Sequence, residues 1–135
     1  KPMSKWLFKS EPDDYSIQTL VKEKSTVWTG VSNPVALKHL KGVKKGDRIL
    51  FYHTGKVKAI VGEMLAKEDA KLEEDEVLVT VHKPQIYPQT LTLATVKADP
   101  ILKEWELARL PRLSVMPISE TQFIRIVELL DTEID

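Results

Sequence analysis

The sequence contains no cysteine, so it can form no disulfide framework and offers no thiolate ligand for zinc. It also has no apolar run near the length of about 18 residues that suggests a membrane span. No secretory signal is recognisable in it. These absences predict a cytoplasmic protein that has no membrane partner.

Glycine is scarce, with five residues, and none of them belongs to a phosphate-binding or nucleophile motif. The chain has no Gly-x-Gly-x-x-Gly, no phosphate loop ending in Gly-Lys-Ser/Thr and no Gly-x-Ser-x-Gly elbow. His39, His53 and His82 lack the spacing of a metal site, and the missing cysteines exclude the usual zinc deaminase signature. We therefore expect no metal, no cofactor and no catalytic residue.

Net charge is absent as well, because 20 basic residues balance 20 acidic ones, but the charges are unevenly spread. Residues 1–60 carry 12 lysines and arginines against 5 acidic residues, whereas residues 61–78 carry 2 against 7. The basic first part can face a phosphate backbone, and a solvated lysine surface explains the same pattern equally well.

The chain has 135 residues, of which 42% are hydrophobic, and this is enough for one domain with a substantial core. No repeat, linker or low-complexity tract divides it, so we predict a single domain over residues 1–135. Residues 1–4 are expected to be a disordered or vector-derived start.

The hydrophobic patterns predict about five or six strands and about four helices. Helices are expected after four capping positions, namely Ser16, Asn33, Asp99 and Ser119. The irregular order favours an α+β fold, with a small twisted mixed β-sheet that curls into a β-barrel and has helices around it. The strands are expected at residues 5–10, 26–28, 48–54, 58–68, 76–87 and 91–96, with Pro84 and then Pro88 ending the fifth.

Several stretches resemble the EVE domain family: "WLFKSEPDDYSI", "VWTGVSN", "KKGDRILFYHT", "AIVGE", "VKADP" and "RLSVMPIS". The similarity runs from about residue 5 to about residue 130. It implies a fold like that of the pseudouridine-synthase-and-archaeosine-transglycosylase (PUA) domains. It also implies a module that binds modified bases in nucleic acid, as the related YTH domains do with an aromatic cage.

The resemblance also implies which residues line the pocket. In EVE and YTH domains a Lys-Ser pair near the first strand and a following tryptophan do so, and these positions are Lys9, Ser10 and Trp28 here. Asn33 matches the family pattern too. The chain departs from the common Trp-Asp-Gly-Val-Arg-Asn-Tyr-Gln-Ala at Thr29, Ser32, Pro34 and Val35, and its acidic segment 67–76 is shorter than in many members. The missing arginine removes a fork-shaped donor, while Thr29 remains a candidate contact beside Trp28.

The residue types leave two interpretations at several of these positions. Trp28 is either the wall on which a flat base stacks or an ordinary core residue. Asn33 is explained fully as a helix N-cap, and it can still present its amide to a pocket beside the helix. Glu11 either accepts an amino or imino proton of a base, or it orients Lys9 and caps backbone groups.

Further candidates come from the ends of strands. Tyr52 and His53 point to opposite faces, and we favour His53 for the pocket. Arg112 either holds a carboxylate such as Glu11 or contacts phosphate, and Ser114 belongs to the same block. Trp6 and Trp105 are assigned to packing in the core or at its rim.

Two functions follow. The first is a non-catalytic binding module that recognises a modified nucleobase, such as a modified cytosine or adenine, in DNA or RNA through an aromatic-walled pocket. The alternative is a hydrolase like those of the related ASCH domains, which would use Lys9 and Glu11 on small modified nucleosides. A protein-interaction module, the third reading, would need a large exposed apolar patch.

Overall fold

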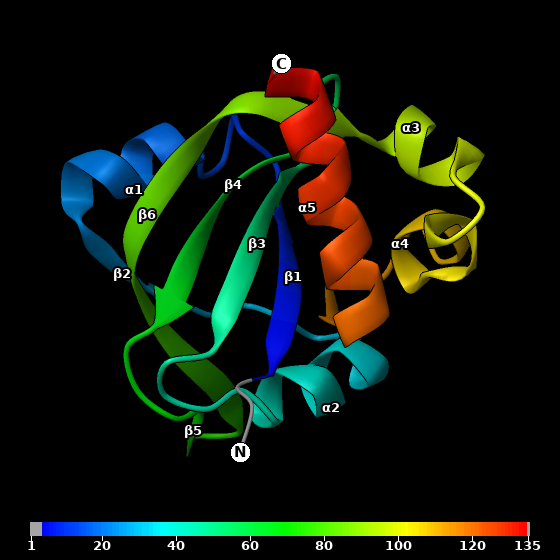
Figure 1. Cartoon of the computed structure of the whole chain (residues 1–135). Helices are drawn as coiled ribbons and strands as arrows, with labels where there is room; N and C mark the ends of the chain where they lie inside the picture. The colour runs from blue at the N-terminus through cyan, green and yellow to red at the C-terminus, as the bar shows by residue number, and fades with distance from the viewer. Residues whose placement is uncertain (1–3, 135) are drawn as a thin grey trace.

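The computed structural model describes residues 4–134 of the chain, with side chains as far as Asp131 (Figure 1). Of the start expected at residues 1–4, only the exposed Ser4 lies among the described residues. Within the described part, no helix is both long and apolar enough to cross a membrane.

One mixed sheet forms the centre of the molecule, in the order β2-β6-β4-β3-β1-β7, with β5 paired only to β6. The pair β1–β3 is parallel, and every other pair is antiparallel. The sheet is therefore open, with β2 and β7 as its edges, and it does not close into the expected barrel. The strands are β1 (Lys5–Ser10), β2 (Ser25–Trp28), β3 (Arg48–His53), β4 (Ala59–Ala66), β5 (Lys71–Glu73), β6 (Glu76–Thr92) and β7 (Val115–Ile118).

The long strand β6 corrects the prediction that the two prolines end it, because it runs through both. Proline removes one donor from a ladder and is tolerated at bulges. Pro84 and Pro88 each lie where the register between β4 and β6 shifts, so the lost N–H groups fall outside regular pairing. The backbone of Lys83, with φ 53°, bends the strand beside the first of these shifts.

Five α-helices and one 3₁₀ helix surround the sheet within residues 4–134 (Figure 1). Two of the N-caps are as predicted, since Ser16 and Asn33 accept backbone N–H groups at the starts of α1 and α2. Ser119 and Gln122 form the expected reciprocal capping box of the last helix. The helices are α1 (Ile17–Glu23), α2 (Pro34–Lys41), α3 (Leu93–Ala98), η1 (Leu102–Glu104), α4 (Glu106–Arg109) and α5 (Glu120–Ile134).

Of the strand predicted at residues 91–96, only Leu91 and Thr92 are in a strand, as the end of β6, because α3 begins at Leu93. Thr92 explains this change, since its side chain caps the helix by accepting the N–H of Thr95 at 3.2 Å. Asp99 then ends α3, and its carboxylate accepts the N–H groups of Ile101 and Leu102. The single helix expected after Asp99 is split into η1 and α4 by the extended backbone of Trp105.

The core lies between the curled sheet and the helices, and both tryptophans assigned to packing belong to it. The indole N–H of Trp6 donates to the buried Asp47 carboxylate at 2.9 Å, and that of Trp105 donates to the carbonyl of Pro117 at 3.0 Å. Each indole thus has its polar atom satisfied inside the protein, as buried donors require.

Candidate functional site

A hollow of about 560 Å³ opens where the edge strand β2 approaches the end of β1. These two strands are four places apart in the sheet order, so the sheet curls strongly enough to bring them face to face. We call this hollow the Trp28 pocket. Its walls come from three segments of the chain: residues 9–11 with 14 and 15, residues 26–33, and Arg112 with Ser114.

Trp28 is half-buried and lines the hollow rather than being sealed beneath it. Its ring packs on Phe8 with centroids 5.4 Å apart, and it meets the edge of Phe51 at 5.5 Å and of Tyr15 at 6.3 Å. These contacts hold the indole in one orientation. Unlike the other two indoles, it makes no Nε1 hydrogen bond to another described residue.

The loop after Trp28 forms the second wall. Gly30 turns the chain at φ 79°, a conformation that glycine adopts without steric cost, and its N–H donates to Glu76 Oε1 at 3.1 Å. Asn33 Oδ1 accepts the N–H groups of Val35 at 2.9 Å and Ala36 at 3.1 Å. The cap therefore uses the oxygen of the Asn33 amide and leaves its NH₂ group, on a residue that lines the pocket, as a donor.

The opposite wall begins where β1 ends. Ser10 Oγ donates to the carbonyl of Tyr15 at 2.6 Å, so its oxygen can still accept a hydrogen bond. Glu11 Oε2 accepts the N–H of Asp13 at 2.8 Å, which is the backbone-capping role considered for this carboxylate. Glu11 also lies over Gly55, where any side chain would collide with the carboxylate.

Two cations reach the same hollow. Lys9 Nζ donates to the carbonyl of Pro111 at 3.0 Å and lies 5.6 Å from the ring centroid of Tyr52. Burial lowers the pKa of Lys9. Arg112 is exposed, and no ion pair joins it to Glu11 among the residues that the structure describes.

The structure places His53 apart from the other predicted site residues. The imidazole is 4% exposed, lies outside the pocket lining, and accepts the N–H of Ile17 at its Nε2 atom at 3.1 Å. Burial lowers the pKa of His53, and the Glu11 carboxylate opposes that shift. Only an unprotonated Nε2 can accept this hydrogen bond, so the ring is neutral. It satisfies a backbone N–H at the first residue of α1.

The other eight predicted residues surround one hollow: Lys9, Ser10, Glu11, Trp28, Thr29, Asn33, Arg112 and Ser114. The sequence reading missed Asp14, Tyr15 and Thr26 as further lining residues. The spacing of the Glu11–Ser16 turn was a usable signal, because a short turn between a strand and a helix cap must return beside the strand end.

The charges of the pocket balance. Lys9 and Arg112 supply two positive charges, while Glu11 and Asp14 supply two negative charges. Hydrogen-bond donors and acceptors thus surround an aromatic wall without a net charge of either sign. This arrangement suits a flat, neutral, polar guest better than a free anion. Among the described residues, no group of three or more His, Asp or Glu side chains could hold a metal ion.

An open, strongly curled mixed sheet with helices around it, and with a pocket between the edge strand β2 and the end of β1, is a PUA-like fold. The chain belongs to the EVE domain family, whose model matches residues 4–129. None of the functionally curated proteins matches it by sequence.

Solved structures share the fold over nearly the whole chain. A hypothetical protein from Leishmania major is 27% identical, with a TM-score of 0.91, and the match covers 99% of this chain and 98% of that one. Rpa0253 from Rhodopseudomonas palustris is 30% identical, with a TM-score of 0.89 and coverage of 96% and 94%. Human THYN1, solved in complex with DNA that contains 5-methylcytosine, is 26% identical, with a TM-score of 0.86 and coverage of 94% and 97%.

A more distant neighbour is an ASCH protein from Zymomonas mobilis. It is 15% identical, with a TM-score of 0.57 and coverage of 93% of this chain and 97% of that one. This likeness shows a shared fold alone.

Proposed function

We propose that the protein is a non-catalytic module that recognises a modified nucleobase in DNA or RNA by receiving the base in the Trp28 pocket. The single observation that carries this proposal is the half-buried indole of Trp28, packed on Phe8 and Phe51, that lines a hollow of about 560 Å³. A base that is flipped out or single-stranded has a flat π face and a polar edge, so it needs an aromatic wall and a few aimed polar groups.

The polar groups around the indole fit such an edge. The NH₂ group of Asn33 and the indole N–H of Trp28 are donors, and the carboxylates of Glu11 and Asp14 are acceptors. Lys9 and Arg112, at the rim, can meet the phosphates that flank the base. The protein thus takes a base that offers both donors and acceptors, as cytosine and adenine do.

The complex of THYN1 supports the same class of ligand, because that relative was solved with DNA containing 5-methylcytosine. An oligonucleotide with one 5-methylcytosine is therefore the first probe. Its matched control has the same sequence with unmodified cytosine, so that any difference in affinity reports the base and not the backbone.

Substitutions of Trp28 test the pocket. We compare Trp28→Leu, which keeps apolar packing on Phe8 and Phe51, with Trp28→Phe, which also keeps a π face. Stacking on an aromatic side chain contributes about 1–3 kcal/mol per base. Trp28→Leu should therefore weaken binding of the modified oligonucleotide by about 5- to 150-fold, and Trp28→Phe by much less.

Fluorescence anisotropy measures the affinities, and thermal unfolding checks that both variants are folded. An unchanged affinity of folded Trp28→Leu for the modified oligonucleotide would rule out the pocket. Intrinsic fluorescence gives a second readout, because the other two indoles are buried and hydrogen-bonded. Binding of the oligonucleotide should quench emission in the wild type and leave Trp28→Leu almost unaffected.

One observation favours a second candidate, a hydrolase of small modified nucleosides. Burial lowers the pKa of Lys9, and a lysine that acts as a nucleophile or a base needs such a change. The amine, however, donates to Pro111 and forms no ion pair with Glu11 among the described residues. Turnover of N4-acylated cytidines that is lost in Lys9→Ala would favour the hydrolase. If the wild type shows no turnover, the binding module remains the better explanation.

A further inference from the structure

A second hollow lies beside the first, at the other end of β2. It has a volume of about 420 Å³ and lies between the end of α1 and the bend of β6. Its lining includes Lys24, Ser25, Lys67, His82 and Lys83, and we call it the lysine groove. No acidic residue lines it. The Trp28 pocket, by contrast, balances its cations with carboxylates.

The three lysines of the groove come from separate parts of the chain. Lys24 ends α1, Lys67 follows β4 and Lys83 lies in β6. None of them forms an ion pair with a described residue. All three line the same groove, and the charges of Lys83 and Lys67 lower the pKa of the adjacent His82 after the larger effect of burial. Positive charges gathered in this way attract an anion.

The backbone places two of these lysines at a conformational cost. Lys24 has φ 73° and Lys83 has φ 53°, in the left-handed region where residues with a Cβ atom are disfavoured. Glycine is the usual residue at such a helix end or bulge. Strained positions of this kind cluster at functional sites, so lysine rather than glycine at these two positions points to a role for their charges.

A third hollow, next to the lysine groove, contains acidic residues as well as lysines. It shares Lys67 and His82 with the lysine groove, but it also contains Glu68 and Asp69. There Lys71 pairs with Glu68 at 3.0 Å, and Asp69 accepts the backbone N–H of Lys45 at 2.8 Å. Glu68 and Asp69 are thus engaged within that neighbouring hollow. Lys24 and Lys83 line only the lysine groove, beside β2.

The position of the groove relative to the Trp28 pocket suggests the anion. Ser25 lines the groove, and the next residues of the edge strand β2, through Trp28, line the pocket. Three residues of a strand span about 10 Å. That length equals about three base-pair steps along the axis of a duplex, at about 3.4 Å per step. A nucleic-acid strand that places a base on Trp28 can therefore lay nearby phosphates along this edge.

We propose that the lysine groove binds backbone phosphates of the same nucleic acid whose base enters the Trp28 pocket, with Lys24, Lys67 and Lys83 as the phosphate contacts. This inference rests on the proposed function, and it assigns to that function a second, sequence-independent surface. Phosphate contacts fix the position of a nucleic acid on a protein, while contacts to the base edge provide the selectivity.

The test measures how affinity depends on salt. Each phosphate contact steepens the fall of log affinity with log salt by about 0.7 to 0.9. We compare the double variant Lys67→Gln/Lys83→Gln with the control Lys97→Gln/Lys103→Gln. Both remove two positive charges, but the control positions lie on α3 and η1, across the molecule from α1 and β2 (Figure 1). The probes are the labelled DNA oligonucleotides with and without one 5-methylcytosine.

We expect the groove variant to reduce the salt slope by about 1.5 and the control variant to leave it unchanged. The affinity ratio between the modified and unmodified probes should be the same in all three proteins, because phosphate contacts carry no base information. Equal slopes in the two double variants would overturn the proposal. If the wild type does not distinguish the two probes, the proposed function fails, while the slopes still decide the groove.

A second arm separates nucleic acid from a membrane surface as the source of phosphate. Vesicles of phosphatidylcholine with anionic phosphatidylserine are mixed with the wild type and both double variants, and binding is measured by sedimentation. We expect that the substitutions of Lys67 and Lys83 leave the amount of protein bound to the vesicles unchanged. Vesicle binding lost only in the groove variant, together with an unchanged oligonucleotide slope, would assign the lysines to lipid headgroups and overturn the proposal.

Discussion

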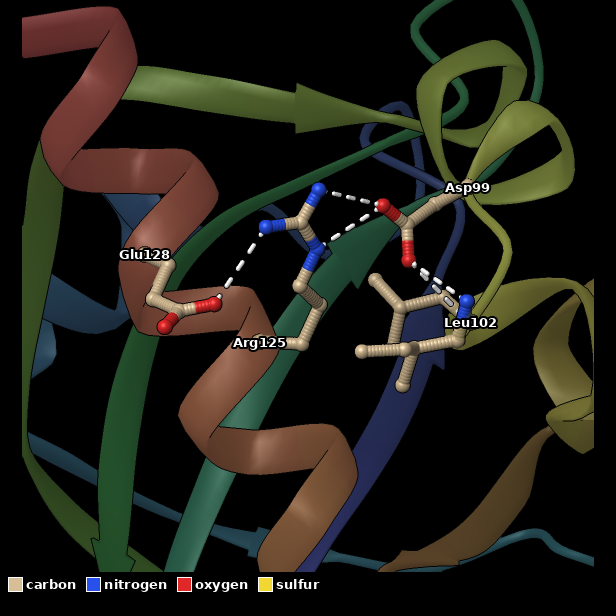
Figure 2. Close-up of polar contacts among 5 residues, drawn as sticks. Asp99, Leu102, Arg125 and Glu128 are labelled. Atoms are coloured by element: carbon tan, nitrogen blue, oxygen red, sulfur yellow. Dashed lines mark hydrogen bonds and ion pairs between the residues drawn. The ribbon is translucent and has the colours of Figure 1, made fainter.

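The corner between α3 and α5 and the Trp28 pocket both contain charged side chains, but they use them in opposite ways. In the corner, Asp99 is 5% exposed and both of its oxygens are engaged (Figure 2). One accepts the N–H groups of Ile101 and Leu102, each at 3.0 Å. The other accepts Nε and Nη2 of Arg125, both at 2.8 Å. Arg125 also reaches Glu128 at 3.3 Å.

The charged groups of the pocket have no such mutual pairing. Lys9 and Glu11 each bond to backbone, and neither forms an ion pair with another described residue. Charges that pair inside a fold depend on one another, because removing one partner leaves the other buried without compensation at a large cost in stability. Charges that keep hydrogen-bonding capacity at the rim of a hollow are available to a ligand. The comparison therefore predicts that changes in the corner alter stability, whereas changes around the pocket alter binding.

The largest effect on stability is expected from Arg125→Met, which keeps an unbranched apolar side chain and removes the partner of Asp99. A buried carboxylate is left with only its two backbone donors. Since Arg125 is partly exposed, water can reach the vacated space and limit the cost to about 2–3 kcal/mol of unfolding free energy. Urea unfolding measures this loss.

Glu128→Gln is the control for that variant, because it removes an exposed charge from the same arginine and should cost less than about 0.5 kcal/mol. Oligonucleotide affinity should be the same in both folded variants and the wild type. If Arg125→Met is as stable as the wild type but binds the oligonucleotide more weakly, the corner takes part in binding, and the contrast with the pocket is wrong.

Acid should weaken the same corner. The hydrogen bonds from Arg125, and then those from Leu102 and Ile101, lower the pKa of Asp99 against the opposing effect of burial. A carboxyl group whose folded pKa is lowered contributes stability above its unfolded pKa of about 3.9 and loses it as the pH falls through the folded value. The stability difference between the wild type and Asp99→Asn should therefore shrink below about pH 4.

Thermal unfolding from neutral to acidic pH measures that difference. A gap between the two proteins that stays constant down to the lowest pH at which both fold would contradict the assignment of Asp99 as an ionised partner of Arg125.

Asn33 contributes both to stability and to the pocket. Its side-chain oxygen caps α2, and its NH₂ group belongs to a residue that lines the pocket. Asn33→Ala removes both groups and should cost about 1 kcal/mol of stability as well as affinity. Asn33→Asp keeps a capping oxygen, removes the donor and adds a negative charge, which the helix N-terminus accepts. We expect it to be as stable as the wild type and to bind the modified oligonucleotide more weakly.

Unfolding and anisotropy measurements on the two variants separate the cap from the pocket. If Asn33→Asp binds as tightly as the wild type, the residue acts only as a helix cap, and the amide donor drops out of the proposed recognition.

Much of the candidate site could be predicted because local chemistry and the family motif agree there. Asn33 followed by Pro34 marks a helix start wherever it occurs, and Lys9, Ser10 and Trp28 match pocket positions in the motif. The structure places these residues around one hollow. Strand alternation did not place His53, because both it and Tyr52 are buried in the curled sheet.

The errors in the fold have non-local causes. Proline disfavours a strand interior, yet β6 passes Pro84 and Pro88 because its partner β4 shifts register at both. No local pattern reveals such a shift. Residues 91–96, Leu-Thr-Leu-Ala-Thr-Val, were predicted as a strand, but the capping side chain of Thr92 and the buried Val96 favour a helix packed on the domain from Leu93 onward. The lysine groove is also non-local, since its three lysines are far apart in the sequence.

The smallest expected effect concerns Lys24, where stability and binding should change in opposite directions. Its left-handed backbone is one that glycine adopts at no steric cost, although glycine also gains freedom in the unfolded chain. Lys24→Gly should therefore leave stability unchanged or raise it by up to about 1 kcal/mol. Lys22→Gly is the matched control, because it removes an equal charge from within α1 and should cost about 1 kcal/mol.

Only Lys24 lines the lysine groove, so only Lys24→Gly should lower the salt slope of oligonucleotide binding, by about 0.7 to 0.9. A variant that is more stable and binds more weakly would show that the charge of Lys24 serves binding at the expense of stability. If Lys24→Gly instead keeps the full salt slope, this lysine has no phosphate contact, and the groove reduces to Lys67 and Lys83.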